Sequence, residues 1–272
     1  MTGFRARPRA AAYCRRWVQA GLVAVAALFF LAGNEVGARP VRIDAPPELL
    51  DLITRHLETD DGGSVAGARD TLRRLRRQIP DLVSTEGYFA AETKLSETAG
   101  EPILTVVPGR RFVIAAVEVR IDGDITAERR QSITGNWSLR TGAPFRQVDW
   151  DSAKQEVLRR LLARDHPKAV LFASEAEVDL DEGTVRLAAT FDAGARYRFG
   201  EIRYLGLGRY RPELIARYNT VMQSGAPYRS APLLALQSDL QNAPYFSSVL
   251  VELGDDTTTA EDGVITAPVL VR

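Results

Sequence analysis

The feature of this sequence that most constrains its fold is an internal repeat. Residues 109–119 match residues 194–204 at a constant offset of 85, with a glycine, an arginine and an aromatic residue at equivalent places. Residues 141–145 match residues 224–228 at an offset of 83 and share the pattern Gly-Ala-Pro-aromatic. Because two blocks recur in the same order, we expect two copies of one structural unit that differ by two residues in length.

The hydrophobic pattern within each copy predicts a strand, two helices and two further strands. In the first copy Val117 and Val119 alternate with other residues, as in a half-buried strand, and Val157 and Leu161 recur at helical spacing. Turn residues at 181–183 then separate two alternating segments, as in a β-hairpin. We therefore expect an α+β protein built from tandem βααββ modules, each large enough for one small core.

Residues 39–108 predict a third, weaker copy of this unit. The same order of elements recurs, with Pro47 at the start of the first helix and Leu75 on the apolar stripe of the second. The Gly-Ala-Pro-aromatic pattern is missing, and Gly-Gly-Ser at residues 62–64 takes its place. We expect tandem domains at residues 39–108, 109–193 and 194–272.

The first 38 residues are expected to form a signal peptide. Arg15-Arg16 ends a basic stretch, residues 18–31 are uncharged and mainly apolar, and small residues then lead to a cleavage site after Ala38. The apolar run is shorter than the roughly 20 residues that a membrane-spanning helix needs, so cleavage is favoured and an uncleaved anchor is the alternative. The single cysteine, Cys14, would leave with the signal peptide, so disulfides would not stabilise the rest.

Charge and residue types exclude several classes of function. The chain has 35 basic and 35 acidic residues; five basic residues and one acidic residue lie up to Ala38, which leaves 30 and 34 beyond it. This slightly acidic part lacks the basic surplus of a nucleic-acid-binding protein. The only histidines are His56 and His166, and no hydrolase or metalloprotease motif occurs. We expect no catalytic residue, no metal and no cofactor.

Several motifs resemble one known family of modules. Residues 191–200 read Phe-Asp-Ala-Gly-Ala-Arg-Tyr-Arg-Phe-Gly, residues 225–228 read Gly-Ala-Pro-Tyr, and Leu-Gln-Ser-Asp-Leu follows at residues 236–240. These segments resemble the POTRA domains of the Omp85 family of outer-membrane assembly proteins. The similarity is greatest to the branch that holds the outer-membrane subunit of the translocation and assembly module, at the junction of its second and third domains.

The resemblance implies an architecture and a role. Each domain would be a three-stranded mixed sheet with two helices on one face. The domains would form a periplasmic arm that binds unfolded outer-membrane or secreted client chains, autotransporter-type clients among them. The resemblance also implies an inner-membrane-anchored companion subunit and attachment to the bacterial outer membrane through a C-terminal β-barrel.

This chain departs from the family pattern in two places. Where the family usually carries Gly-Tyr after the second helix of the middle domain, this chain has His166-Pro167, so the entry to the next strand is expected to differ. The family's proteins continue into a 16-stranded barrel, whereas this sequence stops at Arg272. We expect either a fragment or an arm without its pore.

Sheet edges are the expected binding sites. The resemblance implies that the second strand of each domain lies at an edge, where unpaired backbone N–H and C=O groups can add a client strand without demanding a sequence. The expected edge residues are Ala176, Glu177, Val178, Asp179 and Leu180 in the middle domain and Ser248, Val249, Leu250, Val251, Glu252 and Leu253 in the last. Neighbouring domains that cover these edges are the alternative.

A basic cluster is a second candidate contact face. Its members, on the second helix of the first domain, are Arg69, Arg73, Arg74, Arg76 and Arg77. They could meet anionic lipid head groups or the companion subunit. The alternative is a solvated helix face on which arginine stems cover apolar surface.

Two other classes of protein explain parts of the sequence. A membrane-anchored cell-division scaffold with POTRA-like modules would explain an uncleaved N-terminus, but not two or three copies of the module. A soluble periplasmic chaperone or adaptor would explain the lack of a barrel.

Overall fold

The computed structural model describes residues 41–272 apart from residues 58–64, 99–100, 208–209 and 220–221. The expected signal peptide, with Cys14 and the cleavage site after Ala38, and the Gly-Gly-Ser loop lie outside the described residues. Among the helices of the described part, none is long and apolar enough to cross a membrane.

The first module confirms the weaker copy predicted by the sequence. Its first strand and both helices come before two strands that form a hairpin, although it lacks the Gly-Ala-Pro-aromatic pattern. In order, its elements are β1 (Arg42–Asp44), α1 (Pro47–His56), α2 (Val65–Ser84), β2 (Glu92–Thr98) and β3 (Glu101–Val107).

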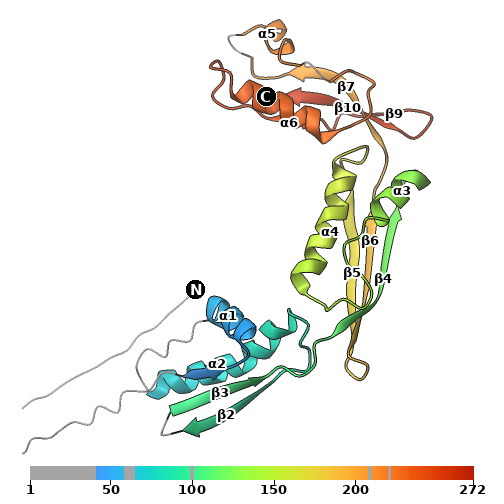
Figure 1. The fold of residues 1–272 in the computed structure, drawn as a ribbon. Coiled ribbons are helices and arrows are strands. Elements are labelled where there is room, and N and C mark those ends of the chain that lie inside the picture. The colour runs from blue at the N-terminus through green and yellow to red at the C-terminus, as the bar shows by residue number, and fades with distance from the viewer. Residues whose placement is uncertain (1–40, 58–64, 99–100, 208–209, 220–221) are drawn as a thin grey trace, which may run out of the picture. The chain divides into compact units, whose positions relative to one another are not determined.

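Modules 2 and 3 repeat this order (Figure 1). Module 2 contains β4 (Val113–Asp122), α3 (Ala127–Thr134), α4 (Gln147–Leu162), β5 (Val170–Asp179) and β6 (Thr184–Asp192). Module 3 contains β7 (Tyr197–Tyr204), α5 (Pro212–Ala216), α6 (Ser230–Gln241), β8 (Val251–Leu253), β9 (Thr258–Thr259) and β10 (Ile265–Val271). The predicted α+β class is therefore confirmed in three βααββ-like modules.

Each module has a mixed sheet with its last strand at the centre. The strand orders are β1-β3-β2, β4-β6-β5 and β7-β10-β8, with the short β9 paired to β10. In every sheet the central strand runs parallel to the first strand and antiparallel to the second. Because the central strand is paired on both sides, the first and second strands of each module are the sheet edges.

A separate hydrophobic core supports each module. The helix stripes expected from the sequence supply these cores: Leu75 of α2, Leu161 of α4 and Leu240 of α6 are all buried. Alternating residues of the central strands, such as Leu187 and Val269, complete them. The helices and the sheet of each module enclose this core between them, so each module is a two-layer unit.

The two repeated sequence blocks of module 2 pair with each other. Ile114 donates its backbone N–H to the Ala143 carbonyl at 2.9 Å, and Phe145 donates to the Phe112 carbonyl at 2.9 Å. The turn that leads into Ala143 needs Gly142, whose φ of +84° lies in the left-handed region. The Gly-Ala-Pro-aromatic loop therefore acts as a short extra strand beside the start of β4.

Module 3 repeats these bonds at equivalent residues. Phe199 donates to the Ala226 carbonyl at 2.9 Å, and Tyr228 donates to the Tyr197 carbonyl at 2.9 Å. Gly225 takes the same backbone conformation as its counterpart, with a φ of +83°. The blocks recur together in the sequence because their backbones are bonded together in each copy.

The residues that begin the first strands of modules 2 and 3 also form backbone hydrogen bonds with the preceding module. Phe112 donates its N–H to the carbonyl of Gly87, which follows α2, at 2.8 Å. Tyr197 donates to the carbonyl of Asp165, which follows α4, at 2.8 Å. Both acceptors have a positive φ, +90° for Gly87 and +67° for Asp165.

The turns after α2 and α4 are equivalent within this chain. Asp165, not His166, takes the place that Gly87 holds in module 1, so the dipeptide to compare with Gly87-Tyr88 is Asp165-His166. Aspartate is among the few residues other than glycine that tolerate a left-handed backbone. The turn into β5 is therefore kept, with a different residue in it.

We expect Gly87→Ala to destabilise the chain more than Gly142→Ala does. Both glycines have a positive φ, which costs an alanine about 1 kcal/mol. A Cβ on Gly87 would also lie 2.6 Å from the Phe145 carbonyl oxygen, whereas one on Gly142 meets nothing within 4 Å. Urea unfolding should show an additional loss of about 1–2 kcal/mol for Gly87→Ala, and equal losses would contradict the assigned contact.

Candidate functional site

Strand β5 is an open edge of ten residues. It pairs with β6 from Val170 to Asp179, and its other side faces no strand of the described chain. Four of the five residues predicted for this edge, Ala176 to Asp179, lie in the strand. Leu180 does not: it belongs to the hairpin turn and its side chain is 61% exposed. The apolar alternation suggested one more strand residue, but the chain has already turned.

The hairpin turn shows which backbone groups of β5 face outward. Gly183 donates its N–H to the Asp179 carbonyl at 2.9 Å, so the backbone groups of Asp179 point toward β6. Backbone direction alternates along an antiparallel strand, and the register is continuous between Ala173 and Asp179. The N–H and C=O groups of Val178 and Ala176 therefore face outward, where an added strand could bond to them.

The other end of β5 exposes large apolar side chains. The register shifts between Leu171 and Ala173, so Phe172 forms a bulge, and its side chain is 75% exposed. Val170 is also exposed. On the helix side, Lys154 of α4 donates to the Ser174 hydroxyl at 3.4 Å. This contact engages a side chain of β5 and leaves its backbone groups free.

The edge predicted for module 3 is shorter and partly covered. Ser248, Val249 and Leu250 come before β8, which contains only Val251 to Leu253. The expected strand was too long because Ser248 and Val249 lie in no strand, although Leu250 still exchanges two 2.9 Å backbone hydrogen bonds with Arg272.

Two glutamines of α6 occupy backbone groups at this edge. Val251 donates its N–H to Oε1 of Gln237 at 3.0 Å, and Gln241 donates Nε2 to the Val249 carbonyl at 3.1 Å. A client strand would have to displace these side chains. Among the predicted edges, β5 is therefore the better acceptor.

Sequence reasoning did not name the edge strand of module 1. β2 runs over seven residues, Glu92 to Thr98, and pairs with β3 on one side. Leu95 in its middle is 49% exposed. The signal was present in the repeat itself, because the second strand of each copy takes the same edge position.

The predicted basic face lies on α2. Arg69, Arg73, Arg76 and Arg77 are exposed there, while Arg74 is half-buried and has an interaction of its own. Leu75 and Ile79 are buried on the opposite side of the helix. Among these four, Arg73 pairs with Asp70 at 3.9 Å.

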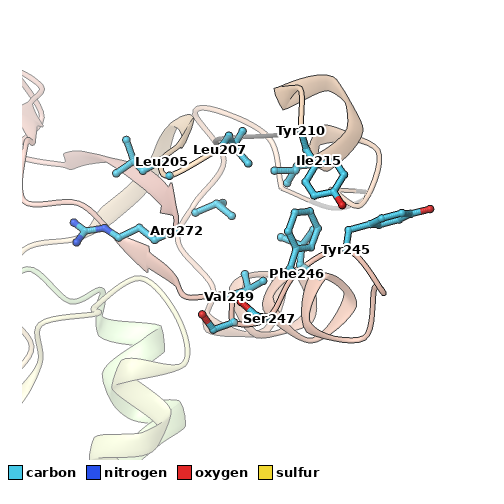
Figure 2. Close-up of a pocket in the computed structure, with 13 residues that line it drawn as sticks. Leu205, Leu207, Tyr210, Ile215, Tyr245, Phe246, Ser247, Val249 and Arg272 are labelled. Atoms are coloured by element: carbon cyan, nitrogen blue, oxygen red, sulfur yellow. The ribbon is translucent and has the colours of Figure 1, made fainter.

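Module 3 also contains an apolar pocket of about 610 Å³ (Figure 2). Its walls include the rings of Tyr210, Tyr245 and Phe246, which pack edge to face with centroids 5.7–6.3 Å apart. Ser248 and Val249, two of the predicted client-binding residues, also line it. The pocket lies between the segment after β7, the segment after α6 and the end of β10, an arrangement that the sequence pattern alone does not show.

His166 lies buried at the entry to β5. Its side chain is 1% exposed, and Nδ1 lies 3.4 Å from the Ala195 carbonyl of the next linker. Burial lowers the pKa of His166 below its ordinary value, although that carbonyl and the nearby Asp165 carboxylate act in the opposite direction. In the part of the chain that the structure describes, no histidine, cysteine and carboxylate cluster could hold a metal ion.

Comparison with known proteins gives similarity in structure at low sequence identity. No protein-family model matches the chain. It is similar to POTRA domains 3–5 of BamA from Haemophilus influenzae, with a TM-score of 0.47, 17% identity, and coverage of 86% of this chain and 96% of that one. It is also similar to POTRA domains 1–3 of Omp85 from Anabaena, with a TM-score of 0.37, 14% identity, and coverage of 86% and 94%. A third similar chain is CdiB from Escherichia coli, with a TM-score of 0.26, 12% identity, and coverage of 79% and 36%.

We expect stability to fall as the pH drops from 7 to 5.5, and His166 to cause part of this fall. A histidine with a lowered folded pKa binds fewer protons in the folded state, so protonation below about pH 6.5 favours unfolding. His166→Gln should flatten the dependence of the unfolding free energy on pH, measured by urea unfolding. Equal slopes in the unmodified chain and in His166→Gln would refute the role of His166.

Proposed function

We propose that this chain is the periplasmic POTRA-type arm of an Omp85-family outer-membrane assembly or translocation factor, which binds unfolded client polypeptides by adding them as strands to its sheet edges. The observation that carries this proposal is the open edge of β5, ten residues long with backbone groups of Val178 and Ala176 free to bond. Main-chain hydrogen bonds supply affinity for many sequences, as a handler of unfolded chains requires.

A finer assignment rests on the sequence motifs. The linker at residues 191–200 and the Gly-Ala-Pro-Tyr block at residues 225–228 favour the branch with the outer-membrane subunit of the translocation and assembly module. In that case clients would include autotransporter-type proteins, and an inner-membrane-anchored companion subunit would be a partner. The exposed arginines of α2 offer a contact face for that companion.

The proposed site can be located by photo-crosslinking. A photoreactive phenylalanine analogue placed at Phe172, on the exposed end of β5, should capture a urea-denatured outer-membrane β-barrel protein diluted into buffer. The same analogue at Val148, an exposed residue on α4 of the same module, is the control and should give little product. Equal yields at both positions, or none at either, would contradict binding at β5.

We expect Ala176→Pro to weaken client binding about two- to tenfold. Proline removes one outward backbone donor, a hydrogen bond worth about 0.5–1.5 kcal/mol, and proline is tolerated on edge strands. Ala176→Ser keeps the donor and serves as the matched control. Binding is measured by fluorescence anisotropy and folding by circular dichroism; unchanged binding by a folded Ala176→Pro variant would exclude this edge.

A further inference from the structure

We propose that β5 selects extended segments that carry lysine or arginine at every second position. The inference rests on the proposed function, because it names the chemistry of the chain that adds to this edge. It is carried by the side chains of β5 rather than by its backbone, and it distinguishes β5 from the edge strands β2 and β4.

The acidic residues of β5 share one face of the sheet. Side chains at alternate positions of a strand point to the same face. Val178 packs against the core of module 2, and Ser174 contacts Lys154 of α4, so these even-numbered residues face the helices. Glu175 and Glu177, between them, therefore face the open side, as does Asp179.

These carboxylates are only partly neutralised. Within the described residues, Glu175 and Glu177 are exposed and neither forms a salt bridge. Arg186 lies directly opposite Glu177 on β6. At the hairpin end, Arg110 donates to the Leu180 carbonyl and is held there. A strand added on the outer side of β5 would place its own side chains next to the acidic row.

Two other edge strands, β2 and β4, lack such a row. On β2, Glu92 and Lys94 lie two residues apart and therefore share the open face. This face thus carries one acidic and one basic side chain. On β4, the first strand of module 2, Glu118 and Arg120 share one face. The Arg120 guanidinium lies 3.9 Å from the Glu118 carboxylate. Opposite charges in directly facing strand positions are favourable and like charges are unfavourable. Selection for basic segments is thus expected at β5 alone among these edges.

The rest of β5 fits an alternating apolar partner. On the helix side its side chains are small at Ser174 and Ala176, which leaves room for apolar residues of an incoming strand. The exposed Phe172 gives such residues a contact at the end of the strand. The best occupant is therefore an extended segment in which basic and apolar residues alternate.

Three peptides of ten residues test the proposal with the full chain. Valine alternates in them with lysine, threonine or glutamate, and binding is measured by fluorescence anisotropy. We expect the lysine peptide to bind on the order of tenfold more tightly than the threonine peptide at low salt, and the glutamate peptide to bind most weakly. The difference should vanish at about 1 M salt, where charges are screened within a few ångströms.

Matched variants assign the effect to the acidic row. The double variant Glu175→Gln, Glu177→Gln should remove the advantage of the lysine peptide, whereas Glu118→Gln, on the opposite edge of the same sheet, should keep it. Asp179 is left intact because its carboxylate accepts the N–H groups of Asp181 and Glu182 in the turn.

The outcomes separate this inference from the function on which it rests. If lysine and threonine peptides bind equally, and Ala176→Pro weakens both, the charge selection is overturned while binding at the edge stands. If no peptide binds, the proposed function fails together with the inference. If Glu118→Gln removes the lysine preference and the double variant does not, the preference belongs to β4 and the assignment to β5 is overturned.

Discussion

The backbone of Phe112 is hydrogen-bonded by two segments that lie far from each other in the sequence. Its N–H bonds to Gly87 of the preceding module, and its carbonyl accepts from Phe145 in the loop of its own module. Tyr197 repeats both bonds with Asp165 and Tyr228. Buried backbone groups without partners are costly, so the turn after a helix, the linker and the Gly-Ala-Pro loop are fixed together. The first strand of each later module, and with it the sheet, begins from this arrangement.

The sequence predicted the order of elements well because periodicity reports directly on burial. The stripe that contains Leu75 identified α2 even without the loop pattern, and Leu161 and Leu240 are buried as expected. Strand ends were predicted less well. Leu180 continues an apolar alternation but lies in a turn, and Leu250 lies outside β8. The alternation of apolar residues does not reveal where a strand ends when the first residue of the turn, as at Leu180, is itself apolar.

What the sequence could not show is which edges are closed. The amide of Gln237 reaches the Val251 N–H only because α6 packs along that side of the sheet, an arrangement that no short motif encodes. At the equivalent place in module 2, Lys154 engages the Ser174 hydroxyl and leaves the backbone free. Two modules with the same element order thus differ in whether a helix side chain bonds to the main chain of the edge strand or to one of its side chains.

The bonds at the linkers have a consequence for how this architecture can be cut and recombined. Phe112 and Tyr197 stand at the start of one module but complete the end of the module before it. A chimera joined within either linker would pair a turn from one protein with a strand start and loop from another. An exchange point between Phe145 and Asp165 would keep each set of bonded segments from a single parent. The exchangeable unit of the chain is therefore offset from the folded module.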